Sequence, residues 1–137
     1  MSKIIAIDTS SDIASVAILN GETLHSSASE GFSSHSMTVL PMLQELLARE
    51  NLTVAACDAI AFGCGPGSFT GLRTACGIAQ GLSLATSLPV VPVVTLEAMA
   101  QTCHERTGAS DVLAMIDARM HEVYWAQYRH KNGRWLA

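Results

Sequence analysis

Short runs of hydrophobic residues, broken by polar turns, dominate the opening of the chain. Residues 3–7 and 13–19 are apolar and rich in β-branched side chains, and a polar turn separates them, which is typical of two strands of a hairpin. Asn20-Gly21 follows directly and favours a type I′ turn, whose two central positions both need a positive φ. With a third strand expected over residues 22–28, the chain should begin with a three-stranded antiparallel meander.

The next segment has the hydrophobic period of a helix and runs to about Glu50. Its apolar positions are Met37, Leu40, Leu43, Leu46 and Leu47. Pro41 lies within this pattern and has no backbone N–H to donate, so we expect the helix either to begin near Pro41 or to kink there.

Strands and helices alternate beyond residue 53. The expected elements are a strand over residues 59–62, a helix over about 70–85, a strand over 90–94, a helix capped by Thr95 that closes at Gly108, and a strand over 112–116. This alternation favours a parallel or mixed sheet flanked by helices, and therefore an α/β fold.

The chain also contains a faint internal repeat. The run that ends at Asp8 and its hairpin, closed by Asn20-Gly21, match a run that ends at Asp117 and a hairpin that reaches Asn132-Gly133. Both copies read strand, acid, turn, strand, turn. Residues 1–108 are thus expected to form one β-β-β-α-β-α-β-α lobe, and residues 109–137 the first hairpin of a second, incomplete lobe.

The predicted end of the second hairpin suggests that more chain follows. It closes with Arg134, Trp135 and Leu136, and no predicted helix is available to cover it. A hairpin without a covering layer is marginally stable in water. We therefore expect the native protein to continue beyond Ala137.

Composition restricts the class of protein. Hydrophobic residues make up 49% of the 137 residues and charged residues 15%, which excludes intrinsic disorder. The formal charge of −4 and the lack of a strong Lys and Arg cluster argue against direct binding of nucleic acid. No apolar run approaches the roughly 18 residues of a membrane-spanning helix, so we expect a cytoplasmic protein without a membrane segment.

The four cysteines form no C-x-x-C pair and lie in apolar or glycine-rich surroundings. They are Cys57, Cys64, Cys76 and Cys103. We expect inert, buried or half-buried thiols in a reducing compartment, and neither a disulfide framework nor a metal site.

A glycine-rich segment with glycines at 63, 65, 67 and 71 leads into the second helix. Glycines allow close backbone approach, and a helix N-terminus favours anions. The segment is neither a Walker loop, since Leu72 and Arg73 follow Gly71, nor a full dinucleotide fingerprint, since Ser68 replaces the third glycine. Phosphate contact and a tight structural elbow both remain open. The candidate nucleotide- or phosphate-binding residues are Asp8, Thr9, Ser10, Gly65, Gly67 and Ser68.

The helix after this segment carries small residues along one side, namely Thr70, Thr74, Gly77 and Gly81. An interior glycine costs a helix about 1 kcal/mol relative to alanine, so these residues should allow something to approach closely. Packing against the sheet and packing against a partner's helix are the two alternatives.

Metal-dependent and hydrolytic chemistry finds no support in the motifs. His121-Glu122 lacks the second histidine of an H-E-x-x-H site, because Trp125 occupies that position. His35 has Val39, not a histidine, four residues later. Because these second histidines are missing, we expect no zinc site. The sequence also contains no G-x-S-x-G motif, so we expect no hydrolase.

Four segments together resemble the bacterial TsaB (YeaZ) family. They are residues 4–10, residues 63–73, His35-Ser36 at the start of the first helix, and residues 117–119 at the turn of the second hairpin. The resemblance runs along the whole chain. It implies one lobe of the duplicated α/β fold shared by actin, Hsp70 and sugar kinases, together with the start of the second lobe.

The resemblance also implies a function. TsaB proteins serve in forming N6-threonylcarbamoyladenosine (t6A) at adenosine 37 of tRNAs that read ANN codons. Their catalytic relative TsaD carries a metal-binding H-x-x-x-H on the helix that begins here at His35, and Val39 places this chain on the non-catalytic side. We therefore expect a scaffold and activator subunit that heterodimerises with TsaD, recruits TsaE, forms a homodimer alone through the same surface, and meets tRNA only through its partner.

The resemblance assigns the partner surface to the first two helices. The candidate contacts are His35, Met37, Leu40, Leu43, Leu47, Leu72, Thr74, Gly77, Ile78 and Gly81. No cofactor is expected in this chain itself, and ATP or ADP at the junction of TsaB and TsaD is left open. The alternative function is that of a nucleotide-binding enzyme like the ATPases and kinases of the superfamily. A metalloprotease is disfavoured because the metal ligands are missing.

Overall fold

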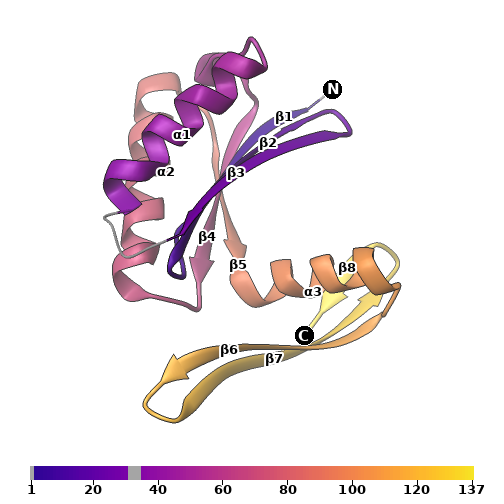
Figure 1. The fold of residues 1–137 in the computed structure, drawn as a ribbon. Coiled ribbons are helices and arrows are strands. Elements are labelled where there is room, and N and C mark those ends of the chain that lie inside the picture. Colours follow the sequence, from indigo (N-terminus) through magenta and orange to yellow (C-terminus); the bar gives the residue numbers. More distant parts are fainter. Residues whose placement is uncertain (1, 31–34) are drawn as a thin grey trace.

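The structure is a computed structural model, and it describes residues 2–30 and 35–137. The first part of the chain builds a five-stranded sheet in the order β3-β2-β1-β4-β5 (Figure 1). Its strands are β1 (Lys3–Asp8), β2 (Ile13–Asn20), β3 (Thr23–Glu30), β4 (Ala59–Gly65) and β5 (Val90–Val94). The first three pair antiparallel, whereas β4 pairs parallel with both β1 and β5. The expected meander and the mixed sheet are both confirmed.

Two helices cover one face of this sheet. Helix α1 (His35–Arg49) and helix α2 (Phe69–Thr86) lie next to each other on the same side (Figure 1). Alternate residues of β1 and β2 point to this face, so the core is built from Ile5, Ile7, Val16 and Ile18 under the leucines of α1. The fully buried side chains of helix α2 are small, Ala75 and Ala79, which lets the helix approach the sheet closely, and its half-buried Ile78 and Leu82 also pack against the core.

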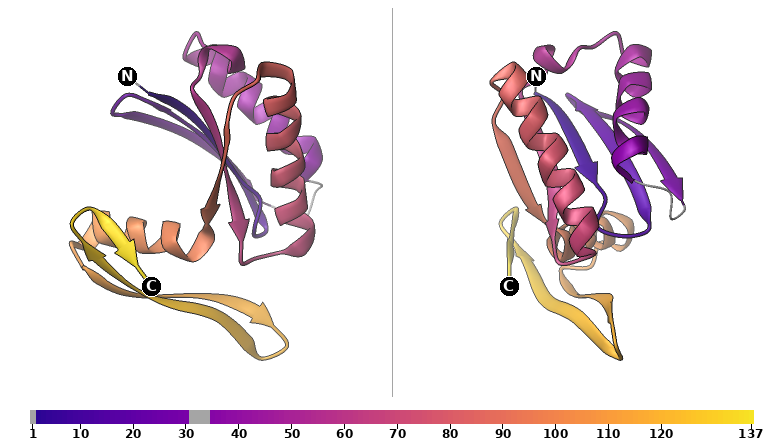
Figure 2. Two further views of the ribbon diagram at one scale, coloured as in Figure 1. Left: turned by 180° about the vertical axis from the view of Figure 1, so that it is seen from behind. Right: turned by 90° about the vertical axis from the view of Figure 1, so that its left-hand side faces the viewer.

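The second part of the chain forms a separate layer. Helix α3 (Thr95–Thr107) packs on a three-stranded antiparallel sheet of β6 (Asp111–Arg119), β7 (Glu122–Lys131) and β8 (Arg134–Leu136), as both views in Figure 2 show. Its own small core consists of Leu96, Ala100, Val112, Ala114 and Tyr128. The predicted boundary between the two lobes, after residue 108, stays a prediction. Helix α3, which that prediction places in the first lobe, packs chiefly on the second sheet.

The expectation that the last hairpin lacks a covering helix is wrong. Trp135 of β8 lies against α3, where its indole N–H donates a 2.8 Å hydrogen bond to the side-chain oxygen of Gln101. The Trp135 ring also meets His104 edge-on and lies 4.8 Å from the ring of His130. The hydrophobic period of residues 95–107 was too weak to reveal that this helix serves the second sheet.

Three local expectations need correction. Helix α1 begins at His35 and contains Pro41, so the late start near Pro41 is wrong. Thr95 does not cap α3, because the N-cap residue is Val94 and the buried Thr95 hydroxyl has no hydrogen-bond partner. The first Asn-Gly turn is not type I′, because its two central residues are Gly21 and Glu22, between the paired Asn20 and Thr23, and only Gly21 has a positive φ (64°).

The remaining differences concern length and exposure. The strands β4, β6 and β7 run several residues beyond the predicted segments, and a short 3-10 helix at Val54–Ala56 was not predicted. Cys64 is exposed, contrary to the expectation of buried or half-buried thiols. Within residues 2–30 and 35–137, no helix combines the length and apolar character needed to cross a lipid bilayer.

Candidate functional site

A cleft of about 860 Å³ lies where the two parts of the chain face each other. One wall comes from the β1–β2 turn, the start of α1 and the start of α2. The other comes from the β6–β7 hairpin. The lining is rich in hydroxyl and charged groups and includes Ser10, Ser11, Asp12, His35, Ser68, Thr70, Thr74, Asp117, Arg119 and Tyr124.

Hydrogen bonds join the β1–β2 turn to the glycine-rich segment that lines this cleft. The Thr9 side chain is fully buried, and its hydroxyl donates to the carbonyl oxygen of Gly71. The N–H of Ser68 donates to the Ser10 carbonyl at 2.7 Å. The turn and the N-terminus of α2 therefore form one hydrogen-bonded unit.

This contact explains three of the glycines. A Cβ atom at Gly63 would collide with the Asp8 carboxylate, one at Gly67 with Ser10, and one at Gly71 with the carbonyl oxygen of Thr9. Each glycine thus permits backbone contact with the first turn of the chain, for which a side chain leaves no room. The structural elbow therefore accounts for these three glycines, and phosphate contact stays a prediction.

Several donors that could bind an anion are already engaged. The N–H of Gly71 donates to the Ser68 hydroxyl, which caps α2, and the N–H of Ser68 is taken by Ser10. The N–H and hydroxyl of Ser10 both donate to Oδ1 of Asp8, at 2.8 and 2.6 Å. Much of the hydrogen-bonding capacity at this helix N-terminus is therefore used within the protein.

The internal repeat is visible in the hydrogen bonds. The Asp8 carboxylate accepts the N–H of Ser10, and the Asp117 carboxylate accepts the N–H of Arg119 at the same 2.8 Å. Asp8 is the last residue of β1 and Asp117 lies two residues before the end of β6, and the residue two positions later donates in each case. The two hairpins share the same local turn chemistry.

The structure separates the candidate nucleotide-binding residues. Ser10, Gly67 and Ser68 line the cleft, whereas Asp8, Thr9 and Gly65 do not. Sequence reasoning missed Arg119 and Tyr124 on the opposite wall, although the repeat had already indicated the neighbouring Asp117. His35, expected on a partner surface, also lines the cleft, and its Nε2 donates to the Ser11 carbonyl at 2.8 Å.

The candidate partner residues fall into two groups. Leu43 and Leu47 are buried in the core beneath α1, and Leu72 and Ile78 are half-buried. Met37 and Leu40 are exposed, as are Gly77 and Gly81, where an added Cβ would meet nothing within 4 Å. The alternative that the two glycines allow packing against the sheet is therefore wrong.

Among the described residues, three groups have raised pKa values, and none of them lines the cleft. Burial raises the pKa of the Cys57 thiol, and the Asp58 carboxylate adds to this. Burial also raises the pKa of Tyr128, with a smaller contribution from Glu97. The pKa of Arg129 is raised by its 2.7 Å ion pair with Asp111. The residues that the structure describes include no cluster of three potential metal ligands among His, Cys, Asp and Glu.

Comparison with known proteins identifies the family. The family model of TsaD, described as tRNA N6-adenosine threonylcarbamoyltransferase, matches residues 17–135. The TsaB protein of Escherichia coli, a tRNA threonylcarbamoyladenosine biosynthesis protein, is 46% identical over 97% of this chain. The chain belongs to the TsaD family, on its TsaB (YeaZ) branch.

Further relatives agree with this branch. The TsaB protein of Haemophilus influenzae is 48% identical over 90% of the chain and 52% of its own length. The solved structure of YeaZ from Pseudomonas aeruginosa superimposes with a TM-score of 0.92 and 43% identity, over 99% of this chain and 64% of that one. These matches confirm the resemblance and the expected fold of the actin, Hsp70 and sugar kinase superfamily. The chain spans 58% of the Escherichia coli protein.

Proposed function

We propose that this chain acts in the formation of t6A on tRNA, as a non-catalytic scaffold and activator subunit that binds TsaD and recruits TsaE. Its TsaB relatives are named as proteins of threonylcarbamoyladenosine biosynthesis. The catalytic step belongs to TsaD in this proposal, because Val39 stands where the resemblance would need the second histidine of a metal pair. Contact with tRNA is assigned to the partner, in keeping with the net charge of −4.

The proposed partner surface is centred on Gly77 and Gly81 of α2. Gly77 and Gly81 are exposed and destabilise a helix, and among the described residues nothing lies within 4 Å of a Cβ added at either position. Met37 on α1 adds an apolar side chain that is 77% exposed. A partner helix laid on the glycines could reach the backbone of α2 closely and bury Met37 and Leu40. The homodimer, in this proposal, uses the same surface.

Co-purification tests the surface. Gly77→Leu and Gly81→Leu should reduce the recovery of TsaD at least tenfold, while circular dichroism shows an unchanged fold, because a Cβ atom added at either position meets nothing within 4 Å in the free chain. Ala98→Leu is the matched control, since it makes a similar addition on the exposed side of α3. An unchanged heterodimer in both glycine variants would refute this surface.

Reconstitution tests the function. Matching TsaD, TsaE, tRNA and substrates should yield t6A when this protein is present and lose most of the product when it is omitted. Product formed equally well without it would overturn the activator role.

The cleft supports a second candidate function. Its volume and polar lining fit a nucleotide held between the two parts of the chain, as in the enzymes of the superfamily. A related possibility for test is that ATP or ADP binds at the junction between this chain and TsaD. Titration calorimetry with ATP and Mg²⁺ distinguishes the two: micromolar binding by this protein alone would favour an enzyme-like role, and no heat would favour the scaffold.

A further inference from the structure

The exposed side of helix α2 extends well beyond its two glycines. It carries, at intervals of three or four residues, Phe69, Arg73, Gly77, Gln80 and Leu84, and all five are exposed. Residues at this spacing lie along one side of a helix, here over a length of about 22 Å. The apolar side chains at its two ends, Phe69 and Leu84, are 67% and 88% exposed. We call these five residues the α2 face.

Arg73 is the one charged residue of α2, and it belongs to the α2 face. The carbon at the centre of its guanidinium group lies 4.2 Å from the centroid of the Phe69 ring. Among the described residues, Arg73 forms no hydrogen bond and no ion pair. An aromatic ring attracts a cation but offers no oxygen to the five guanidinium N–H groups. Those N–H groups therefore remain available to a carboxylate.

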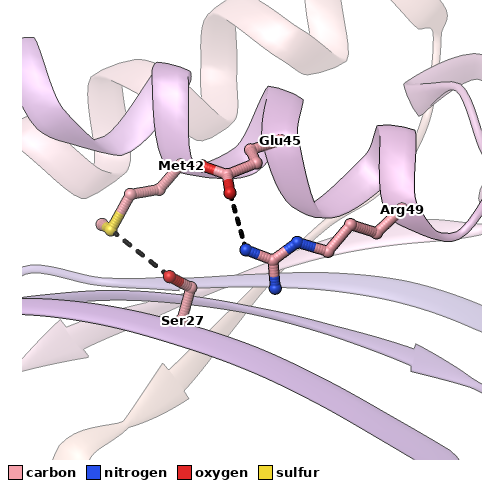
Figure 3. Close-up of polar contacts among 4 residues, drawn as sticks. All are labelled: Ser27, Met42, Glu45 and Arg49. Atoms are coloured by element: carbon pink, nitrogen blue, oxygen red, sulfur yellow. Dashed lines mark hydrogen bonds and ion pairs between the residues drawn. The ribbon is translucent and has the colours of Figure 1, made fainter.

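The first two helices do not supply that carboxylate themselves. Helix α1 contains one acidic residue, Glu45, and Figure 3 shows it paired with Arg49 one turn later, at 2.6 Å. Glu50, which follows α1, forms a 3.0 Å ion pair with His25. Helices α1 and α2 together therefore carry two arginines and one carboxylate. They form a positively charged surface on a chain whose formal charge is −4.

This charge distribution affects the two expected occupants of the surface differently. A second copy of the chain brings another Arg73 and, from these two helices, only a carboxylate that already has a partner. Burial of a guanidinium group without a carboxylate costs free energy. A partner helix with an acidic side chain opposite Arg73 instead forms a charge-assisted, bidentate pair. Because Phe69 already contacts the Arg73 side chain, less conformational entropy is lost when that pair forms.

We propose that Arg73 determines which partner this surface prefers: it pairs with a carboxylate on a helix of TsaD, and so favours the heterodimer over a second copy of this chain. The inference rests on the proposed function, in which both partners use the same two helices. Gly77, one turn after Arg73, allows the partner helix to approach the backbone. Phe69 covers one side of the guanidinium group and so reduces the screening of the ion pair by water.

Binding measurements with purified TsaD, beside sedimentation of the chain alone, test this preference. Arg73→Gln removes the charge at an exposed position and should raise the Kd of the heterodimer about tenfold. The Kd of the homodimer should change less than about twofold or fall, because no carboxylate pairs with Arg73 there. Arg73→Lys keeps the charge and should recover part of the affinity for TsaD. Arg106→Gln, at an exposed arginine of α3, is the matched control and should leave both constants unchanged.

The salt dependence of binding separates an ion pair from a loss of packing. The affinity of the unaltered chain for TsaD should fall more steeply with rising salt than that of Arg73→Gln.

The possible results also distinguish this inference from the proposed function. An unaltered chain that does not bind TsaD would overturn both. Heterodimer formation that is lost in Gly77→Leu but kept in Arg73→Gln would leave the proposed function intact and overturn the role of Arg73. An equal loss of heterodimer and homodimer in Arg73→Gln would overturn it as well, since Arg73 would then not discriminate between the partners.

Discussion

The β1–β2 and β6–β7 hairpins share a sequence pattern but have different surroundings. In both, an aspartate at or near the end of the first strand accepts a hydrogen bond from the N–H of the residue two positions later. The first turn is then enclosed, because Thr9 is fully buried beneath the start of α2. The second turn projects from the sheet, and Met120 at its tip is 90% exposed.

The backbone φ angles of the two turns also differ. Arg119, Met120 and His121 all have positive φ values, between 54° and 65°, although none is a glycine. The first turn has no positive φ between Asp8 and Ile13. A free hairpin tip must follow the twist of its own strands, while the first turn is shaped by the helix that packs on it. The local hydrogen bond of the aspartate is thus common to both turns, whereas tertiary contacts determine the backbone conformation and exposure of each turn.

The largest expected effect on stability comes from a substitution that disrupts the packing of the first turn against α2. Gly71→Ala should lower the free energy of unfolding by about 3 kcal/mol, because its Cβ would collide with the Thr9 carbonyl and force the turn away from α2. Gly77→Ala, in the same helix but in open space, should raise it by about 0.5–1 kcal/mol. Urea unfolding measures both. Equal effects of the two substitutions would contradict the close contact at Gly71.

A smaller effect compares the two aspartates. Asp8→Ala should cost about 2 kcal/mol, since the half-buried carboxylate accepts both the N–H and the hydroxyl of Ser10. Asp117→Ala should cost about 0.5 kcal/mol, because this exposed carboxylate accepts one N–H. Thermal and urea unfolding of the two variants should rank them in this order. A greater loss for Asp117→Ala would show that the second turn is the more constrained one.

The smallest effect lies in the pH dependence of the second sheet. Burial holds the pKa of Tyr128 above its ordinary value near 10, so the neutral phenol is favoured in the folded state. This contribution is complete below the unfolded pKa and is lost as pH rises through the folded pKa. Tyr128→Phe should reduce the loss of stability between pH 8 and 11. Tyr124→Phe, on the same strand, is the matched control, and an identical alkaline loss in all three proteins would refute the assignment.

The fold was largely predictable because its signals are local. Alternation of apolar residues indicated the meander, and the segment from residue 53 onward indicated alternating strands and helices, both of which the structure confirms. The site was less predictable. Arg119 and Tyr124 reach the cleft only because the second sheet is positioned against the first, and sequence spacing alone carries no information on that contact.

The sequence by itself determined the elements, the repeat and the family, because each depends on short motifs whose chemistry is complete within a few residues. Only the tertiary structure decided the role of the glycines. Gly63, Gly67 and Gly71 accommodate the first turn of the same chain, whereas Gly77 and Gly81 face open space. It also decided that α3 covers the second sheet. Both outcomes depend on which surfaces meet, and distant segments determine that only when the whole core is packed.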